Sequence, residues 1–258
     1  MMGRLRLRSA TPALLARVDR PEGVLLVLLL AGLAAVGWLG SDLWLAIAAG
    51  MQLMIAGLGA VWIIGPARPG MGLARYATLS AAAVSMTLFG RVLVDSVGLL
   101  VFLPVAVALW VVLWAELHAE PGSGPSLALD LSLVGLVFAA AAGALHLVPA
   151  SSWPPVILLV LLLALVPALR SAEARGRGGV EAVGQAALHL VAVAQIGTAV
   201  ILLGMPEVVA AALVALGFHA WSGAAEALEG GAASWSVAVE FGALAILGLV
   251  VALLLYGV

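Results

Sequence analysis

The stretch from Tyr76 to His118 limits the fold of this chain more than any other, because it is too long and too apolar for one membrane crossing. Before its last three residues, Arg91 and Asp95 are its only charged side chains. A helix of about 43 residues would be about 65 Å long, roughly twice the hydrocarbon thickness of a bilayer. We therefore expect two spanning helices folded back on each other, with the turn near residues 95–98.

Composition places the rest of the chain in lipid as well. Hydrophobic residues make up 65% of the chain and charged residues 9%, whereas soluble domains carry about 25% charged residues. The segments between apolar runs are short, which excludes a water-soluble catalytic domain between them. Cysteine and lysine are absent, which excludes disulfides, thiolate metal sites and a lysine Schiff base. The net charge of −2 gives no indication of nucleic-acid binding.

The pattern of apolar runs predicts an all-α fold, a polytopic integral membrane bundle. A basic segment, residues 1–22, precedes a single transmembrane domain, residues 23–258. About nine helices fit into that domain. The expected spans are residues 23–39, 43–64, 76–95, 98–118, 127–148, 156–169, 182–203, 207–225 and 235–256. The sixth and eighth spans are short and can be tilted or re-entrant.

The distribution of arginine predicts the orientation. If residues 1–22 lie in the cytoplasm and the spans alternate, then all of the eleven arginines except Arg91 fall on or beside cytoplasmic segments. In this interpretation Arg75 and Arg170 belong to cytoplasmic loop regions. The use of arginine for every basic residue is typical of a GC-rich bacterial genome. We therefore expect a multi-pass protein of the bacterial cytoplasmic (inner) membrane, with its N-terminus inside.

Arg91 and Asp95 form the first candidate site. They stand four residues apart, so they share one helix face and can pair. The functional interpretation is an anion or proton site in the outer half of the membrane. The alternative is that Arg91 extends to the outer head groups while Asp95 caps the hairpin. Arg91 lies about 24 Å from the inner face, and this depth favours the alternative.

A second candidate site combines polar residues of the last three spans. Gln185 and His189 lie one helical turn apart, and His189, His219 and Glu240 all fall about 9 to 11 Å from the inner face. Two imidazoles and a carboxylate at one depth can bind a divalent metal, ligate haem or relay protons. No His-x-x-His or His-Glu-x-x-His spacing supports a metal site, and interhelical hydrogen bonding is the alternative.

Other polar residues fall near the predicted ends of spans. Glu116, His118 and Glu120 end the fourth span, and Asp130 begins the fifth. We interpret them as interfacial residues rather than ligands. His146 falls at the outer end of the fifth span, far from the other histidines.

Three functions remain open at this level. The first is a transporter or channel for a small solute, ion or lipid-like molecule; Gln52 and Gln195 extend its candidate path of Gln185, His189, His219, Glu240, Arg91 and Asp95. The second is a non-catalytic membrane subunit of a larger complex, or a homo-oligomer, which short loops and small-residue helix faces suit. The third is an intramembrane enzyme or redox protein that uses a metal or haem. We favour transport, with membrane lipids as partners and no nucleic acid; the sequence identifies no catalytic residue.

Overall fold

The computed structural model describes residues 21–65, 72–119, 126–148 and 153–256. Residues 1–20 of the predicted basic segment (residues 1–22), together with Arg68 and Glu120, lie outside these ranges, so the roles expected for them stay predictions. The last two residues of that segment already belong to the first described helix. Within the described ranges the chain forms helices joined by short turns and contains no strand. The all-α fold class is thus confirmed.

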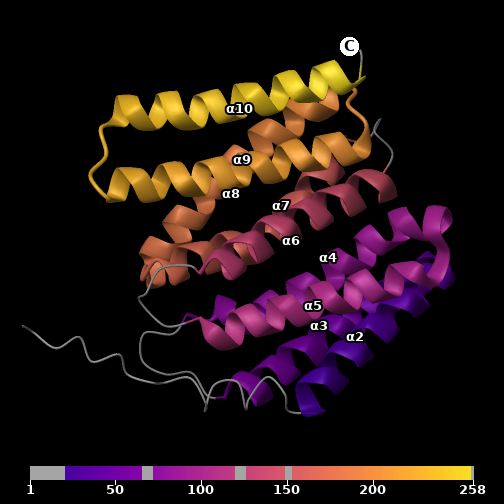
Figure 1. Ribbon diagram of the computed structural model, residues 1–258. Helices are drawn as coiled ribbons and strands as arrows, with labels where there is room; N and C mark the ends of the chain where they lie inside the picture. The colour runs from indigo at the N-terminus through magenta and orange to yellow at the C-terminus, as the bar shows by residue number, and fades with distance from the viewer. Residues whose placement is uncertain (1–20, 66–71, 120–125, 149–152, 257–258) are drawn as a thin grey trace, which may run out of the picture.

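The first half of the chain contains the expected hairpin. Gly98 follows the third described helix, α4 (Ala74–Val97), with φ of 61°, a positive value that glycine adopts without a steric penalty. The chain reverses there, and the next helix returns beside the previous one (Figure 1). The elements of this half are α2 (Pro21–Leu39), α3 (Asp42–Ile64), α4 (Ala74–Val97), the 3-10 turn η1 (Gly98–Val101) and α5 (Phe102–His118).

The second half adds five helices, and its turns alternate between the two ends of the bundle. In Figure 1 the turn between α8 and α9 lies at the right, and the turn between α9 and α10 lies at the left. The helices are α6 (Leu127–Leu147), α7 (Trp153–Ala174), α8 (Gly179–Leu202), α9 (Glu207–Glu229) and α10 (Ser234–Tyr256).

Two predicted spans are too short. The sixth, residues 156–169, lies within a helix that continues from residue 153 to residue 174. Pro154 and Pro155 occupy its first turn, where a backbone N–H has no helical partner to lose. Arg170 and Ser171 are buried at its other end, so polar residues continue the helix instead of ending it. The eighth span likewise extends four residues further, to Glu229.

Eight helical segments of the described chain are long and apolar enough to cross a membrane. The hairpin counts once among them, because α4, η1 and α5 form the uninterrupted segment Ala74–His118. The structure therefore supports a multi-pass membrane protein. Nine crossings require α4 and α5 each to traverse the bilayer, and that number stays a prediction, as does the cytoplasmic N-terminus.

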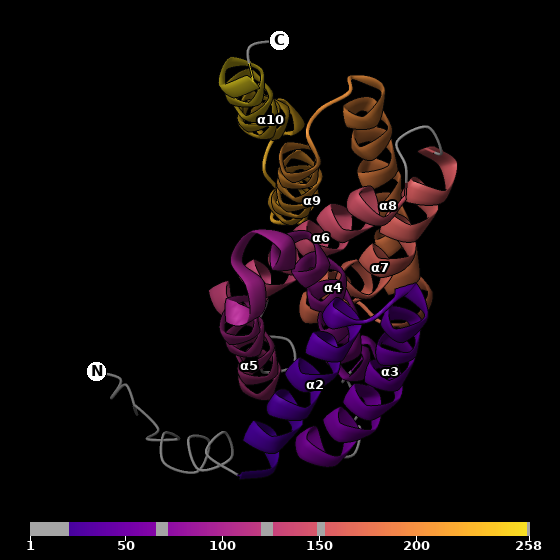
Figure 2. The same ribbon diagram turned by 90° about the vertical axis from the view of Figure 1, so that its right-hand side faces the viewer.

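Helix α4 contributes to one of two hydrophobic clusters and packs against the other. One cluster is built from α2, α3, α4 and α5, and the other mainly from α6, α7, α8 and α9. Close approach of α4 to α6 depends on Gly143, since a Cβ at that position would lie 2.4 Å from the Cβ of Leu88. Glycine at such contacts is how membrane helices pack without a hydrophobic driving force. Figure 2 shows that α10, by contrast, lies at the edge of the molecule beside α9.

Buried polar side chains join α2, α3 and α4. Gln52 donates from Nε2 to the carbonyl of Leu30 at 2.9 Å, and the hydroxyl of Thr87 donates to Gln52 Oε1 at 2.8 Å. Trp38 donates from Nε1 to the Thr87 carbonyl at 2.8 Å. Gln52 is fully buried and satisfied within the bundle. It therefore acts here as an interhelical hydrogen-bonding residue.

Candidate functional site

One end of the bundle, called here the arginine-rich end, carries Arg75, Arg170, Arg175 and Arg177. A buried carboxylate, Glu116 of α5, lies at the centre of its ionic network and is 1% exposed. Arg170 of α7 binds this carboxylate in a bidentate fashion, with Nε 2.9 Å from Oε1 and Nη2 2.9 Å from Oε2. Arg75 of α4 lies 3.7 Å from the carboxylate and also donates to the Glu116 carbonyl. The network therefore ties α4, α5 and α7 together.

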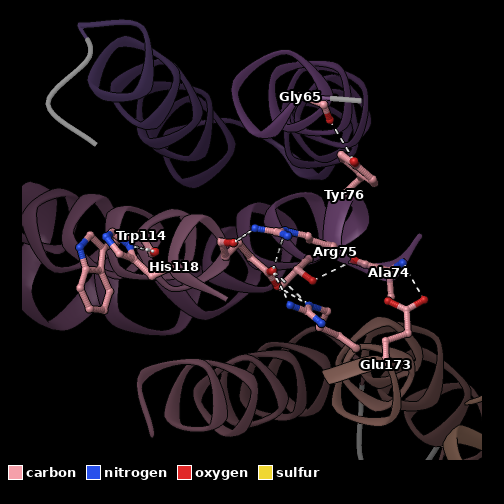
Figure 3. A network of polar contacts seen from close by, with 10 residues as sticks. Gly65, Ala74, Arg75, Tyr76, Trp114, His118 and Glu173 are labelled. Atoms are coloured by element: carbon pink, nitrogen blue, oxygen red, sulfur yellow. Dashed lines mark hydrogen bonds and ion pairs between the residues drawn. The ribbon is translucent and has the colours of Figure 1, made fainter. Parts of the chain in front are cut away.

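A second carboxylate completes this network. Glu173, on the last turn of α7, accepts a hydrogen bond from the backbone N–H of Ala74 at 3.2 Å. Figure 3 shows Glu173 beside Ala74, and it shows the Arg75 side chain extending towards α5. A carboxylate at the first residue of a helix satisfies an N–H that has no helical partner and complements the helix dipole. When all four side chains are ionised, the charges of Arg75, Arg170, Glu116 and Glu173 cancel.

The sequence predicted an interfacial position for Glu116, and the structure shows in addition that its side chain is buried inside the bundle. The signal for burial was present in the spacing. Val105, Leu109 and Val112 are buried at positions separated by four and three residues, and Glu116 follows four residues later on the same stripe. A carboxylate on the buried stripe of an apolar helix requires a cationic partner, and Arg170 supplies it.

His189 joins α8 to α9 through hydrogen bonds at both of its ring nitrogens. Its Nδ1 lies 2.9 Å from the carbonyl oxygen of Gln185, which can only accept, so Nδ1 carries a hydrogen. Its Nε2 lies 3.0 Å from the Ser222 hydroxyl on α9 and accepts from it in the neutral ring. Arg175 of the arginine-rich end donates to the Ser222 carbonyl at 3.3 Å. His189 is 1% exposed, and its ring packs against Phe218.

A cavity of about 360 Å³ opens between α8 and α9 next to His189. Gln185 lies at its polar end, where Nε2 donates to Glu229, while the buried Oε1 has no hydrogen-bond partner among the described residues. The remaining wall is apolar, and its large side chains are substantially exposed at the outer surface. These outward-facing side chains are Leu188, Trp221 and Leu228. The cavity is therefore reached from the side of the bundle, where lipid would lie.

Glu229 also joins the cavity to the loop before α8. Arg177 lies 3.2 Å from Glu229 and pairs with Glu181 as well. The hydrogen bond and charge of Glu229, followed by the charge of Glu181, raise the pKa of Arg177 above its ordinary value. Arg177 thus stays charged beside Glu229 at any physiological pH.

A second cavity, of about 230 Å³, lies on the other half of the same pair of helices, where α10 also contributes. Its lining is entirely apolar and consists of Ile196, Ala199, Val200, Leu203, Leu213, Leu216, Gly217, Ala245 and Leu249. The side chain of Ile196 occupies the space that a Cβ at position 217 would need, so it packs directly against Gly217. We call the two cavities and the helix contact between them the α8–α9 seam.

The three predicted metal ligands do not converge. His219 lies 3.8 Å from Asp130 of α6, whereas His189 hydrogen-bonds to Ser222, and Glu240 is exposed on α10. Among the described residues, no group of three or more His, Asp or Glu side chains is placed to hold a metal ion. The metal or haem site stays a prediction that this geometry does not support.

At the opposite end of the bundle, Arg91 stabilises the end of α2 and does not pair with Asp95. Its guanidinium donates to the carbonyls of Trp38 at 2.6 Å and Gly40 at 2.9 Å, and it lies 4.0 Å from Asp42. Asp95 is exposed. Terminal carbonyls of a helix lack partners, so a cation there is favourable. Neither interpretation from sequence anticipated this position, because Arg91 and α2 are some 50 residues apart.

Replacing Arg91 with methionine is expected to lower the free energy of unfolding by about 1 to 3 kcal/mol, because the α2 carbonyls lose their donors. Thermal unfolding in mild detergent measures the effect. Replacing Asp95 with asparagine on the same helix is the control and should leave the unfolding temperature unchanged. Equal unfolding temperatures for both variants would show that Arg91 contributes nothing through these contacts.

The remaining predicted interfacial residues lie close to helix ends. His146 is 3.1 Å from Glu207 at the start of α9, so its partner is a carboxylate rather than a second histidine. His118 Nδ1 lies 2.8 Å from the Trp114 carbonyl, and the two rings are in contact. Neither histidine is part of the α8–α9 seam.

Comparison with known protein families, curated proteins and solved structures gives no match to this chain.

Proposed function

We propose that this protein binds a small amphipathic, lipid-like molecule in the α8–α9 seam and moves it within the membrane. The observation that carries the proposal is the cavity beside His189, which has polar groups at one end and an outward-facing apolar wall. A volume of about 360 Å³ falls in the usual range of small-molecule sites. A polar solute would require a polar path across the bundle, whereas the second cavity of the seam is wholly apolar.

The unpaired atom in the cavity favours one type of head group. Gln185 Oε1 is buried, and it can only accept a hydrogen bond. The orientation of this amide is fixed because its other end donates to the Glu229 carboxylate. A ligand that offers a hydroxyl or amine hydrogen would satisfy the free acceptor. The proposed ligand is therefore a single-chain amphiphile with a hydroxyl- or amine-bearing head group.

The depth of these groups suits such a molecule. Gln185 lies six residues, or about 9 Å, into α8, which places it just inside the head-group boundary of one leaflet. The expected orientation puts this boundary on the cytoplasmic side. An acyl chain would extend from Trp221 towards Ile196 and the second cavity. Movement along the seam requires a rotation of the Ile196 side chain, which packs against Gly217.

Replacing Gln185 with leucine is expected to reduce ligand binding about tenfold, because the cavity loses its hydrogen-bond acceptor. The probe is a monoacylglycerol with a diazirine in its acyl chain, and the readout is photolabelling of α8 and α9 peptides in reconstituted vesicles. Gln195→Leu is the matched control, since Gln195 is exposed on the same helix and does not line either cavity.

Movement is measured separately in the same vesicles. A fluorescent monoacylglycerol that exchanges between leaflets becomes accessible to a membrane-impermeant quencher, and Gln185→Leu should slow that exchange. Labelling that spreads evenly over all helices would contradict the binding site. If labelling is specific but the protein does not speed exchange relative to protein-free vesicles, the protein binds the ligand and does not transport it.

A further inference from the structure

Helix α10 turns most of its surface away from the bundle. Only 6% of its apolar window, Ser234–Val251, is buried, compared with 22% to 61% for the other seven apolar segments. Its packed face is marked by Val237, which is 5% exposed, and by Phe241, which lies against Gly223 of α9. Figure 2 shows α10 beside α9 at the edge of the molecule. Lipid or another helix has to cover the remaining surface.

Glu240 lies on this outward surface. It is exposed, and no hydrogen bond or ion pair joins it to another described residue. The 23 residues of α10 extend about 34 Å, close to the hydrocarbon thickness, and Glu240 lies about 9 Å from the start of the helix. Its carboxylate therefore lies inside the apolar layer, where an unpaired charge is costly and usually indicates a partner.

Helical periodicity tells which side of α10 carries Glu240. Ala245 and Leu249 face α8, because they line the second cavity of the seam. Seen along the helix axis, they are displaced to one side of Phe241, which packs on α9. Glu240 directly precedes Phe241 and is therefore displaced by about 100° to the other side, towards α6. His219 of α9 faces the same side, towards Asp130 of α6.

His219 adds a second unsatisfied group on that side. Its Nδ1 has no hydrogen-bond partner among the described residues, and the 3.8 Å to Asp130 is too long for one. The side chain is 46% exposed, although it lies about 15 Å from the end of α9. Glu240, His219 and Asp130 therefore give this side of the α9–α10 pair an acidic, incompletely paired character within the membrane.

We infer that this side of α10 binds a transmembrane helix of another protein, which carries a lysine or arginine at the depth of Glu240. A second copy of this chain is a poor occupant. The described arginines already contact carboxylates or carbonyls of their own chain, and none lies on α9 or α10: Arg75, Arg91, Arg170, Arg175 and Arg177. Two α10 helices packed about a two-fold axis would also bring the Glu240 carboxylates together. The inference does not depend on a ligand in the α8–α9 seam.

The test uses the full-length protein in phosphatidylcholine vesicles, with a donor fluorophore on an introduced Ser234→Cys; the chain has no native cysteine. The probe is a 23-residue leucine–alanine transmembrane peptide with one lysine seven residues from its end and an acceptor fluorophore. A second peptide has leucine in place of the lysine. The lysine peptide is expected to bind at least tenfold more tightly than the leucine peptide, as measured by energy transfer.

Glu240→Gln should abolish this preference, and Glu207→Gln, which alters an exposed carboxylate at the other end of α9, should retain it. Matching thermal unfolding of the variants shows that each one is folded. Equal binding of both peptides to the unmodified protein would overturn the inference and leave lipid as the occupant. Energy transfer between differently labelled copies, unaffected by either peptide, would overturn it in favour of a homo-oligomer.

Discussion

Replacing Glu116 with alanine is expected to lower the free energy of unfolding by about 3 to 5 kcal/mol, the typical cost of removing one partner from a buried ion pair. The substitution leaves Arg170 without its bidentate partner and deprives Arg75 of the same carboxylate. Glu116→Gln should lie between alanine and the original residue, because the amide retains one acceptor oxygen. Denaturant unfolding in mild detergent, followed by the loss of helical circular dichroism, measures all three proteins.

Glu181→Gln is the matched control for this experiment. Glu181 also pairs with an arginine, Arg177, but its side chain is 57% exposed. Water and salt screen exposed pairs, so this variant should unfold at the same denaturant concentration as the original protein. If Glu116→Ala unfolds at the same denaturant concentration as Glu181→Gln, the network does not hold α4, α5 and α7 together.

Replacing Gly143 with alanine is expected to destabilise the protein by about 1 to 3 kcal/mol through overpacking. The new Cβ would lie 2.4 Å from the Cβ of Leu88 and 2.8 Å from its carbonyl carbon. A backbone atom cannot move aside by a rotamer change, so α4 and α6 would have to separate. Thermal unfolding, monitored by tryptophan fluorescence, measures the effect.

Gly135→Ala on the same helix provides the opposite expectation. No atom lies within 4 Å of a Cβ at that position, so the substitution meets no obstacle. Alanine has a higher helix propensity than glycine by up to about 1 kcal/mol, which predicts equal or greater stability. Two destabilised variants would show that helix flexibility, rather than the contact with Leu88, explains the effect at Gly143.

The helices themselves could be predicted from the sequence, because the bilayer thickness sets the length of an apolar run and turn residues mark its ends. Gly98 is an example, since the predicted turn ends where its positive φ reverses the chain. Gly204 is another: it has φ of 65° and precedes Pro206, after which α9 begins at the predicted residue. These signals depend on residues close in the sequence, so they do not change with the packing of distant helices.

The partners of the polar residues could not be read in the same way. The spacing of Arg91 along its helix predicted a depth, but its carbonyl acceptors lie on a helix some 50 residues earlier. Arg170 was assigned to a loop because a charged residue normally ends a span. In the structure it lies within α7 and pairs with Glu116 of another helix. Spacing along a chain gives the depth and face of a residue. It does not say which helix lies opposite that face.

The same distinction explains the outcome for the second candidate site. Gln185 and His189 share one face of α8, and both line the cavity. His219 and Glu240 were predicted at a similar depth, yet their faces turn towards α6 and the exterior. Equal depth on consecutive helices was the only basis for grouping them, and depth alone does not determine convergence.

The central position of α4 has a consequence for biosynthesis. Five of its polar side chains are buried only because neighbouring helices surround them: Arg75, Thr78, Ser80, Ser85 and Thr87. The partners of Thr87 and Ser80 lie on α3, which is synthesised earlier, but the carboxylate that Arg75 contacts belongs to Glu116 of α5. Until α5 is available, the Arg75 charge would lack that contact, and insertion energetics disfavour such a charge beside acyl chains. We expect α4 to wait at the insertion machinery until α5 has been synthesised, so that the two enter the bilayer as a pair. Ribosomes that stall before α5 emerges should therefore carry an α4 that has not yet entered the bilayer.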